Sequence, residues 1–549
     1  MRQRGIMMRM LLPAAAMLLT ALNAAGAARS PVQMVSLPVR SGMAPVVSCA
    51  SLATLDLTGI PGAPTAVRSA RLEHFGPSQK PFCLVKGYVA PQVQFELHLP
   101  SRGYTGRYLQ GGCGGACGVF WDSLIPSCDS RPAFDGAFAV AFEDSGHVGA
   151  SPMDVVWAAN DRALRVDFAY RAAHVTALAA KALIAAYYGK APAESYFQGC
   201  SDGGREALME AERYPADFNG IVAGSPAIWI TPGVVRFVWE IKITHDGERQ
   251  ILSPAAVQLL HRAVLQACDR LDGVQDGQID DPRACHYDPA ALLCRAGQSP
   301  PQCLTAEQVR VVRELYRGPT DENGHFLYLG GEPYGSELTW LDDHGLINGG
   351  TPLLENQIKY MTFDGHPPAD FAWNGLSFDA KKLRTLIEKA GFYDASAADL
   401  NAFRRRGGRL ILWQGTADSP AGSYSLLDYY QRVRDAVGGL EAARKFARVF
   451  LVPAVYHCNG GYIPYEEDFL GTMVNWVEKD RAPRAVIAAA VMSDGKTRTR
   501  PVFAYPVRAR YKGTGSIDRA SSFTGVMPTR IPDDRFEWLG AHMRGGPPS

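Results

Sequence analysis

Residues 195–213 read SYFQGCSDGGREALMEAER and contain the local pattern that decides the fold. The segment predicts a short strand over 195–198, a tight turn over 199–204 and a helix over 205–213. A serine in such a turn is held clear of the sheet, and the glycines let the backbone turn sharply. Ser201 is therefore a candidate nucleophile. The alternative is that Ser201 only caps the helix.

The alternation of strands and helices around this turn predicts an α/β fold with a parallel sheet. Apolar runs and helical periodicity indicate strands at 107–110, 137–142, 409–413 and 447–452, and helices at 167–188 and 423–437. Residues 93–99 alternate between apolar and polar side chains, which is typical of a half-buried strand. We therefore expect an antiparallel entry into the sheet.

A long irregular stretch interrupts this alternation. Residues 226–406 contain many glycine, proline, aspartate and aromatic residues. We expect this stretch to form a large insertion or second domain. Residues 31–225 and 407–549 would then form the two halves of one sheet-containing domain.

Two further side chains complete a possible catalytic group. Asp418 and His457 each follow a predicted strand, so they would lie at the carboxyl edge of the sheet with Ser201. A serine nucleophile needs a base, and the base needs an orienting acid. The chain order Ser201, Asp418, His457 is the order found in α/β-hydrolases. Taken alone, His457 would more often be an ordinary surface or core histidine.

Composition excludes several classes of protein. The 549 residues include 47% hydrophobic side chains, which is enough to form folded domains. The 56 Lys and Arg residues nearly cancel the 55 Asp and Glu residues and leave a formal charge of +1. No general field would attract nucleic acid or an anionic membrane, so we expect neither as a partner.

The N-terminus has the pattern of an export signal. Arg2, Arg4 and Arg9 precede an apolar run that ends in small residues around Ala25-Gly26-Ala27. The run is shorter than the roughly 20 residues that a membrane span needs. We therefore expect residues 1–27 to be a cleaved signal peptide and the mature chain to be secreted or periplasmic.

Export makes the eleven cysteines candidates for disulfides. Cys200 and Cys458 flank Ser201 and His457, so they would lie close enough to bond if that serine and histidine meet. The alternative is two unrelated buried cysteines. We also expect disulfides at Cys49, Cys83, Cys268, Cys285, Cys294 and Cys303, with Cys268 near Cys285 and Cys294 near Cys303 in sequence. The pairing of Cys113, Cys117 and Cys128 stays open.

Cys200-Ser201, Asp418 and His457-Cys458, together with the large insertion, resemble the tannase and feruloyl esterase family. The resemblance implies an α/β-hydrolase fold with a lid domain at 226–406. It also implies hydrolysis of esters of aromatic acids of hydroxycinnamic or gallic type. The substrates would be small aromatic esters, which can be linked to plant polysaccharides. Alternatives are other aromatic esters such as mono(2-hydroxyethyl) terephthalate, a serine peptidase of the same fold, or a ligand-binding protein without activity.

The preferred acyl group and the oligomeric state stay open. Aromatic side chains in the insertion could stack on an aromatic substrate, although such residues more often form the core of a domain. These candidates are Trp229, Trp340, Trp373 and Phe378.

An acidic segment in the insertion predicts a metal site. Residues 269–281 hold five carboxylates and two glycines, a density of oxygen ligands that suits Ca²⁺. The alternative is a solvated acidic loop. The resemblance implies a structural calcium bound by the side chains of Asp269, Asp272 and Asp276 and the backbone carbonyls of Val274 and Gln278.

A serine hydrolase also needs N–H donors for the oxyanion. The residue after the nucleophile, Asp202, would supply one. The glycine-rich segment 110–115 is the expected source of the second, from Gly112 or Cys113. No Lys-Ser or Lys-Thr pair follows these glycines, so a nucleotide phosphate site is disfavoured.

Overall fold

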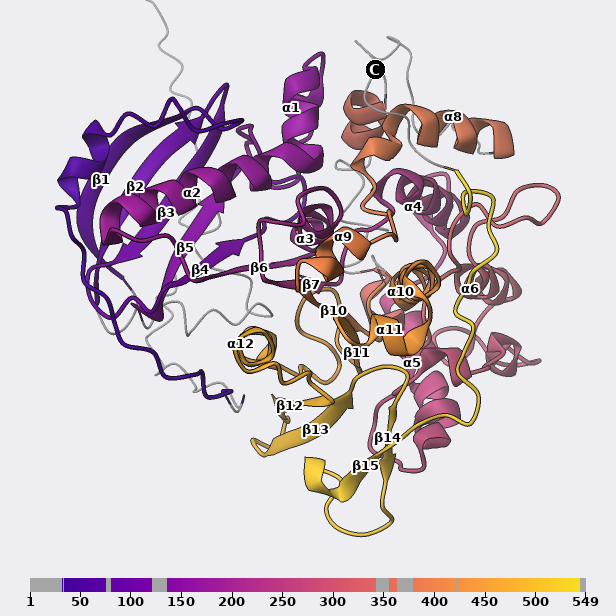
Figure 1. Cartoon of the computed structure of the whole chain (residues 1–549). Helices are drawn as coiled ribbons and strands as arrows, with labels where there is room; N and C mark the ends of the chain where they lie inside the picture. Colours follow the sequence, from indigo (N-terminus) through magenta and orange to yellow (C-terminus); the bar gives the residue numbers. More distant parts are fainter. Residues whose placement is uncertain are drawn as a thin grey trace, which may run out of the picture.

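A computed structural model describes residues 32, 34–75, 80–120, 136–341, 355–362, 379–419 and 422–543. The expected signal peptide and Cys128 lie outside these residues. Figure 1 shows a central sheet with helices packed on both of its faces. The chain therefore builds the layered arrangement of an α/β protein.

The central sheet contains nine strands among the described residues, in the order β1-β2-β3-β5-β4-β6-β7-β10-β11. Strands β1, β2, β3 and β5 pair antiparallel, and the pairs from β5 through β11 are parallel. The strands are β1 Thr65–Phe75, β2 Lys80–Val89, β3 Val93–Pro100, β4 Arg107–Gly111, β5 Phe138–Glu143, β6 Glu194–Cys200, β7 Gly220–Gly224, β10 Arg409–Gly415 and β11 Ala447–Val452. The prediction of an α/β fold is confirmed, including the antiparallel entry.

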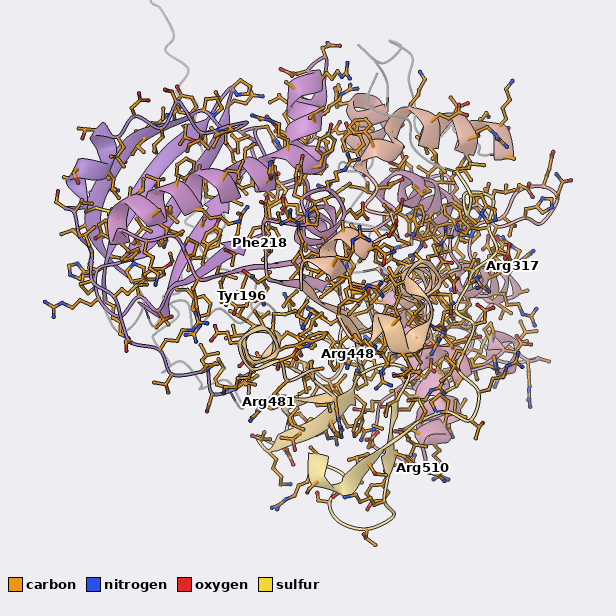
Figure 2. All side chains as sticks on the ribbon, in the orientation of Figure 1. Tyr196, Phe218, Arg317, Arg448, Arg481 and Arg510 are labelled. Atoms are coloured by element: carbon orange, nitrogen blue, oxygen red, sulfur yellow. A yellow bond between two sulfur atoms is a disulfide. The ribbon has the colours of Figure 1, made fainter. Side chains whose placement is uncertain are left out.

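Alternate residues of the parallel strands pack on opposite faces of the sheet. In β10, Leu410 and Leu412 join the core beneath α2, α3 and α10, whereas Ile411 and Trp413 join the core beneath α12. Because both faces of the strand are buried, successive residues are all apolar, and the strand reads as a continuous apolar run. The covering helices are α2 Ala172–Tyr188, α3 Asp202–Arg213, α10 Ser423–Val437 and α12 Phe469–Lys479. Figure 2 labels one side chain from each core, Phe218 and Tyr196.

The segment between β7 and β10 is mainly helical and has its own core. Leu260, Val311 and Trp340 are buried together there, away from the sheet. The segment contains α4 Ile230–Thr244, α5 Pro254–Cys268, α6 Ala306–Arg317, α8 Ala380–Ala390 and α9 Asn401–Arg405, with short strands β8 His245–Asp246 and β9 Arg249–Gln250. These helices lie beside the β10 and β11 end of the sheet (Figure 1).

Two small hairpins follow the sheet. They pair β12 Ala485–Val491 with β13 Thr497–Phe503, and β14 Arg508–Tyr511 with β15 Phe523–Val526. They form the yellow region at the foot of Figure 1. No helix among the described residues combines the length and apolar character needed to cross a lipid bilayer.

Candidate active site

Ser201 lies on a sharp turn between β6 and α3. Its backbone has a φ of 63° and a ψ of −120°, a conformation that is strained for a residue with a side chain. A Cβ on Gly199 would lie 2.4 Å from the carbonyl oxygen of Gly203, so only glycine fits this approach. The Ser201 side chain makes no capping hydrogen bond. The turn therefore presents the serine hydroxyl and does not use it as a helix cap.

Ser201, His457 and Asp418 form one hydrogen-bonded chain. The Nε2 atom of His457 lies 2.8 Å from Oγ of Ser201. The Nδ1 atom of His457 lies 3.1 Å and 3.0 Å from the two carboxylate oxygens of Asp418. Asp418 follows β10 and His457 follows β11, so the carboxyl edge of the sheet brings these residues together.

The carboxylate of Asp418 is fully buried and also accepts a hydrogen bond from Nε2 of Gln414. Burial lowers the pKa of His457, but the charge and hydrogen bond of Asp418 outweigh burial, so the net pKa is raised. The imidazole is thus prepared to accept a proton from Ser201.

A disulfide lies directly behind this group. Cys200 and Cys458 are bonded, with their Cα atoms 5.9 Å apart. The other four disulfides of the described residues are Cys49–Cys83, Cys113–Cys117, Cys268–Cys285 and Cys294–Cys303. The expected cysteines are therefore bridged. The structure also joins Cys113 to Cys117, a pairing that the sequence left open.

The glycine-rich segment differs from the expectation at two positions. The N–H of Gly112 donates to the carbonyl of Gln198 at 2.9 Å, because the segment still continues the β4–β6 pairing. The N–H of Cys113 donates to Oε2 of Glu206 at 3.0 Å. Neither N–H is therefore available to an oxyanion. Within the described part of the chain, the N–H groups of Asp202 and Gly114 have no such acceptor.

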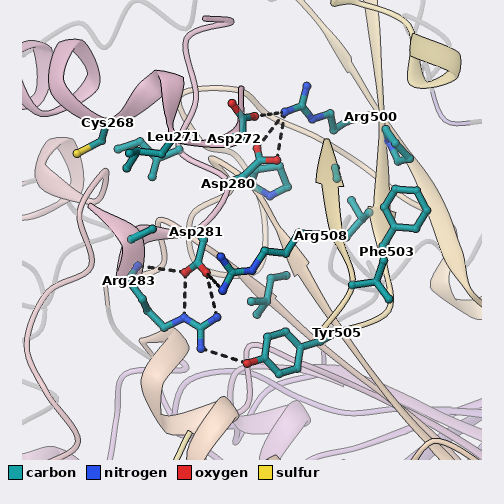
Figure 3. A pocket seen from close by; sticks show the side chains of 18 residues that line it. Cys268, Leu271, Asp272, Asp280, Asp281, Arg283, Arg500, Phe503, Tyr505 and Arg508 are labelled. Atoms are coloured by element: carbon teal, nitrogen blue, oxygen red, sulfur yellow. Dashed lines mark hydrogen bonds and ion pairs between the residues drawn. The ribbon is translucent and has the colours of Figure 1, made fainter. Parts of the chain in front are cut away.

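The acidic segment contains an ion-pair partner that sequence reasoning missed. Arg500, from β13, contacts Asp272 at 2.8 Å and also reaches Asp280 (Figure 3). It contacts Asp276 as well, at 2.7 Å. Asp269 instead accepts the backbone N–H groups of Asp276 and Gly277. Arg500 stands more than 200 residues away in sequence, so no local pattern could have indicated it.

The acidic segment contains two carboxyl groups whose pKa values are raised. The Oδ1 atom of Asp276 is buried and has no hydrogen-bond partner among the described residues. Burial and the charge of Asp280 raise the pKa of Asp272 to about 7. Burial also raises the pKa of Asp276, to about 6, although Arg500 opposes this shift. Other arginines also lie at this segment, because Arg498 donates to the carbonyl of Asp276, and Arg283 and Arg508 pair with Asp281. The carboxylate oxygens are donors of the kind that a hard divalent cation prefers.

Two clusters of described side chains have the spacing to hold a metal ion, and neither includes a carboxylate of residues 269–281. One contains Cys113 and Cys117 with Asp202 and Glu206, but its cysteines are joined in a disulfide. The other contains His174, Glu210 and Asp217. Among the aromatic candidates for stacking, Trp229 and Trp340 are buried in cores, and Trp373 and Phe378 lie outside the described residues.

Comparison with known proteins gives a consistent result. The model of the tannase and feruloyl esterase family matches residues 80–526. An uncharacterized esterase of Xanthomonas campestris is 31% identical over 493 residues, covering 81% of this chain and 84% of that protein. The mono(2-hydroxyethyl) terephthalate hydrolase of Piscinibacter sakaiensis is 30% identical over 509 residues, covering 80% and 82%.

Solved structures agree with these sequence matches. Feruloyl esterase B from Aspergillus oryzae superposes with a TM-score of 0.77 at 26% identity, covering 87% of this chain and 100% of that one. A tannin acyl hydrolase from Aspergillus niger has a TM-score of 0.72 at 19% identity, covering 92% and 99%, and supports the fold alone.

The sheet, the serine turn and the Ser–His–Asp geometry define a serine hydrolase of the α/β-hydrolase class. Within that class, the chain belongs to the tannase and feruloyl esterase family, and it is a carboxylester hydrolase.

Proposed function

We propose that the protein hydrolyses esters of hydroxycinnamic or gallic-type acids with Ser201 as the nucleophile. The observation that carries this proposal is the 2.8 Å contact between Nε2 of His457 and Oγ of Ser201. In the proposed reaction, His457 takes the hydroxyl proton as Ser201 attacks the ester carbonyl, and then protonates the leaving alcohol. Asp418 holds the imidazole in the required tautomer. Water then cleaves the acyl-enzyme with the same base.

The oxyanion of each tetrahedral intermediate needs N–H donors. We assign these to Asp202 and, in place of Gly112 or Cys113, to Gly114. Gly114 is buried, and its N–H has no acceptor within the described residues. A buried N–H without a partner is rare, which favours a ligand as its acceptor. Its neighbour Cys113 lies against the serine turn, because its carbonyl accepts the N–H of Gly203 at 2.8 Å.

The substrate class rests on the relatives. The names of two of the similar proteins specify feruloyl or terephthalate esters, both of which have an aromatic acyl group. The 30% identity to the terephthalate enzyme makes mono(2-hydroxyethyl) terephthalate a second candidate substrate. We propose residues 226–406 as the lid that selects the acyl group, and esters carried by plant polysaccharide as a natural source.

We further propose that residues 269–281 bind a structural Ca²⁺. Asp269, Asp272 and Asp276, with the carbonyls of Val274 and Gln278, would hold the ion. The unpartnered Oδ1 atom of Asp276 and the raised pKa of Asp272 support this assignment. The ion would neutralise repulsion in the loop and take no part in the reaction.

The N-terminal pattern and the five disulfides support export, to the periplasm or outside the cell. Such a location would keep the cysteines oxidised and give the enzyme access to polymer-linked esters.

The test combines active-site labelling with a substrate panel. A fluorophosphonate should label Ser201, and Ser201→Ala should lose the label. Cleavage of methyl ferulate, methyl gallate, chlorogenate and mono(2-hydroxyethyl) terephthalate should be measured. Each ester should be compared with the anilide of the same acid. Faster cleavage of the anilide would support the peptidase alternative, and absence of label would support a binding protein.

A further inference from the structure

Glu206 links the nucleophile helix to the glycine-rich loop. It lies in the second turn of α3 and is only 4% exposed. Its Oε2 atom accepts the N–H of Cys113 at 3.0 Å, and its Oε1 atom accepts the hydroxyl of Ser145 at 3.0 Å. One carboxyl group therefore connects α3, the loop after β4 and the loop after β5.

The loop is held at several points around Gly114. The Cys113–Cys117 disulfide closes a five-residue ring whose interior begins at Gly114. The carbonyl of Cys113 accepts the N–H of Gly203, and the ring of His147 contacts the carbonyl of Ala116 at 2.8 Å. These contacts hold the backbone on both sides of Gly114, and the one at Cys113 joins it to the serine turn.

We propose that Glu206 is a positioning residue, which together with the Cys113–Cys117 disulfide holds the Gly114 N–H in the orientation needed to bind the oxyanion. This inference rests on the proposed function, in which Gly114 is an oxyanion donor. The physical reason is that an oxyanion donor acts only when it is aimed at the position of the developing charge. A displacement of about 1 Å can reduce the rate about 100-fold.

Other charged groups face Glu206, and they show how its variants should behave. Glu143, Asp202 and Arg205 surround it, and burial and the charge of Asp202 raise the pKa of Glu206 to about 7. Burial and the charge of Glu206 likewise raise the pKa of Glu143. Because the N–H of Cys113 needs only one acceptor oxygen, a glutamine side chain can replace the carboxyl group at this contact.

The experiment compares Glu206→Gln with Glu206→Leu, and Glu210→Leu serves as the matched control. Glu210 lies one turn further along α3 and is equally buried, and its carboxylate oxygens have no hydrogen-bond partner within the described residues. We expect Glu206→Leu to lower kcat between about tenfold and 100-fold, with KM changed less than about threefold. Glu206→Gln and Glu210→Leu should keep kcat within about threefold of the wild type.

A second readout separates positioning from folding. An arylboronic acid forms a tetrahedral adduct with the serine, so its affinity should fall in parallel with kcat in Glu206→Leu, while the affinity for the product acid is kept. If Glu206→Leu lowers only the melting temperature, or lowers kcat no more than Glu210→Leu does, the proposal is wrong.

A disulfide variant covers the case in which Glu206→Leu fails to fold. Cys113→Ser/Cys117→Ser should show the same loss of kcat and of boronate affinity. Where both variants fold, their combination should cost little more than the larger single effect, because they position one loop. Unchanged kcat and boronate affinity in the disulfide variant would overturn the role of the bridge. Failure of Ser201 to take a fluorophosphonate would instead reject the proposed function itself.

Discussion

Cys200 and Cys458 are joined by a disulfide, and each is the immediate neighbour of a residue in the hydrogen-bonded pair Ser201 and His457. Ser201 and His457 are 256 positions apart in the chain and lie on turns after different strands, β6 and β11. A covalent link directly behind their hydrogen bond therefore limits how far the two turns can separate.

Loss of this link should affect both stability and rate. Closing a loop of 258 residues should stabilise the fold by about 5 kcal/mol on the chain-entropy account. We expect Cys200→Ala/Cys458→Ala to lower the melting temperature and kcat together. Cys294→Ala/Cys303→Ala removes a disulfide in the segment between β7 and β10 that spans only nine positions. This variant should lower stability less and keep kcat. A double variant at Cys200 and Cys458 with normal kcat would show that the link has no catalytic importance.

Substitution of the nucleophile should separate activity from stability. Ser201→Ala should lower kcat by at least about four orders of magnitude and leave the melting temperature nearly unchanged. Ser253 provides the contrast, because its side chain caps α5 by accepting the N–H of Ala256. Ser253→Ala should cost about 1 kcal/mol in stability and keep kcat. The assignment of Ser201 fails if its alanine variant keeps more than about a tenth of the wild-type kcat.

The pH dependence of kcat/KM should report on His457. The base must be neutral to act, so activity should rise as pH increases through the pKa of His457. Burial lowers that pKa, and Asp418 raises it by a larger amount. Asp418→Asn should therefore move the acid limb to lower pH and reduce kcat by about 10⁴. Asp435→Asn, on the exposed face of α10, should change neither, and an unmoved limb in Asp418→Asn would argue against this electrostatic coupling.

Calcium should stabilise the protein more at neutral pH than in acid. The raised pKa values of Asp272, about 7, and Asp276, about 6, mean that the metal-free fold binds these protons more tightly than the unfolded chain does. The protonated carboxyl groups of Asp272 and Asp276 therefore stabilise the metal-free fold below about pH 4, and this stabilisation is lost as pH rises toward 7. Ca²⁺ needs the ionised carboxylates, so its increase in melting temperature should be larger at about pH 8 than at about pH 5.

The control for this prediction is another aspartate of the same inserted segment. Asp272→Ala should abolish the effect of Ca²⁺ and of chelator on the melting temperature. Asp288→Ala, which removes an exposed ion pair with Arg313, should preserve that effect. Equal melting curves of the wild-type protein with Ca²⁺ and with chelator at both pH values would leave a solvated acidic loop as the explanation.

Much of the site follows from short-range patterns. The serine turn is predictable because the sharp backbone at Ser201 requires small neighbours such as Gly199 and Gly203, and these stand beside it in sequence. Asp418 and His457 are predictable because each follows an apolar strand, and parallel strands bring their carboxyl ends to one edge. The Cys200–Cys458 pairing then follows from adjacency to Ser201 and His457.

The sequence by itself therefore determined the α/β class, the nucleophile turn and the members of the Ser–His–Asp group, since each depends on local backbone and periodicity. Only the tertiary structure decided which N–H groups of the glycine-rich loop have an acceptor among the described residues. Glu206 accepts the N–H of Cys113 although it lies 93 positions away in sequence, and the carbonyl of Gln198 in β6 accepts the N–H of Gly112. It also decided that Arg500 enters the acidic segment from a distant hairpin. The physical reason is that a hydrogen bond or ion pair depends on distance in space, and residues this far apart meet only when the sheet and its insertion pack together.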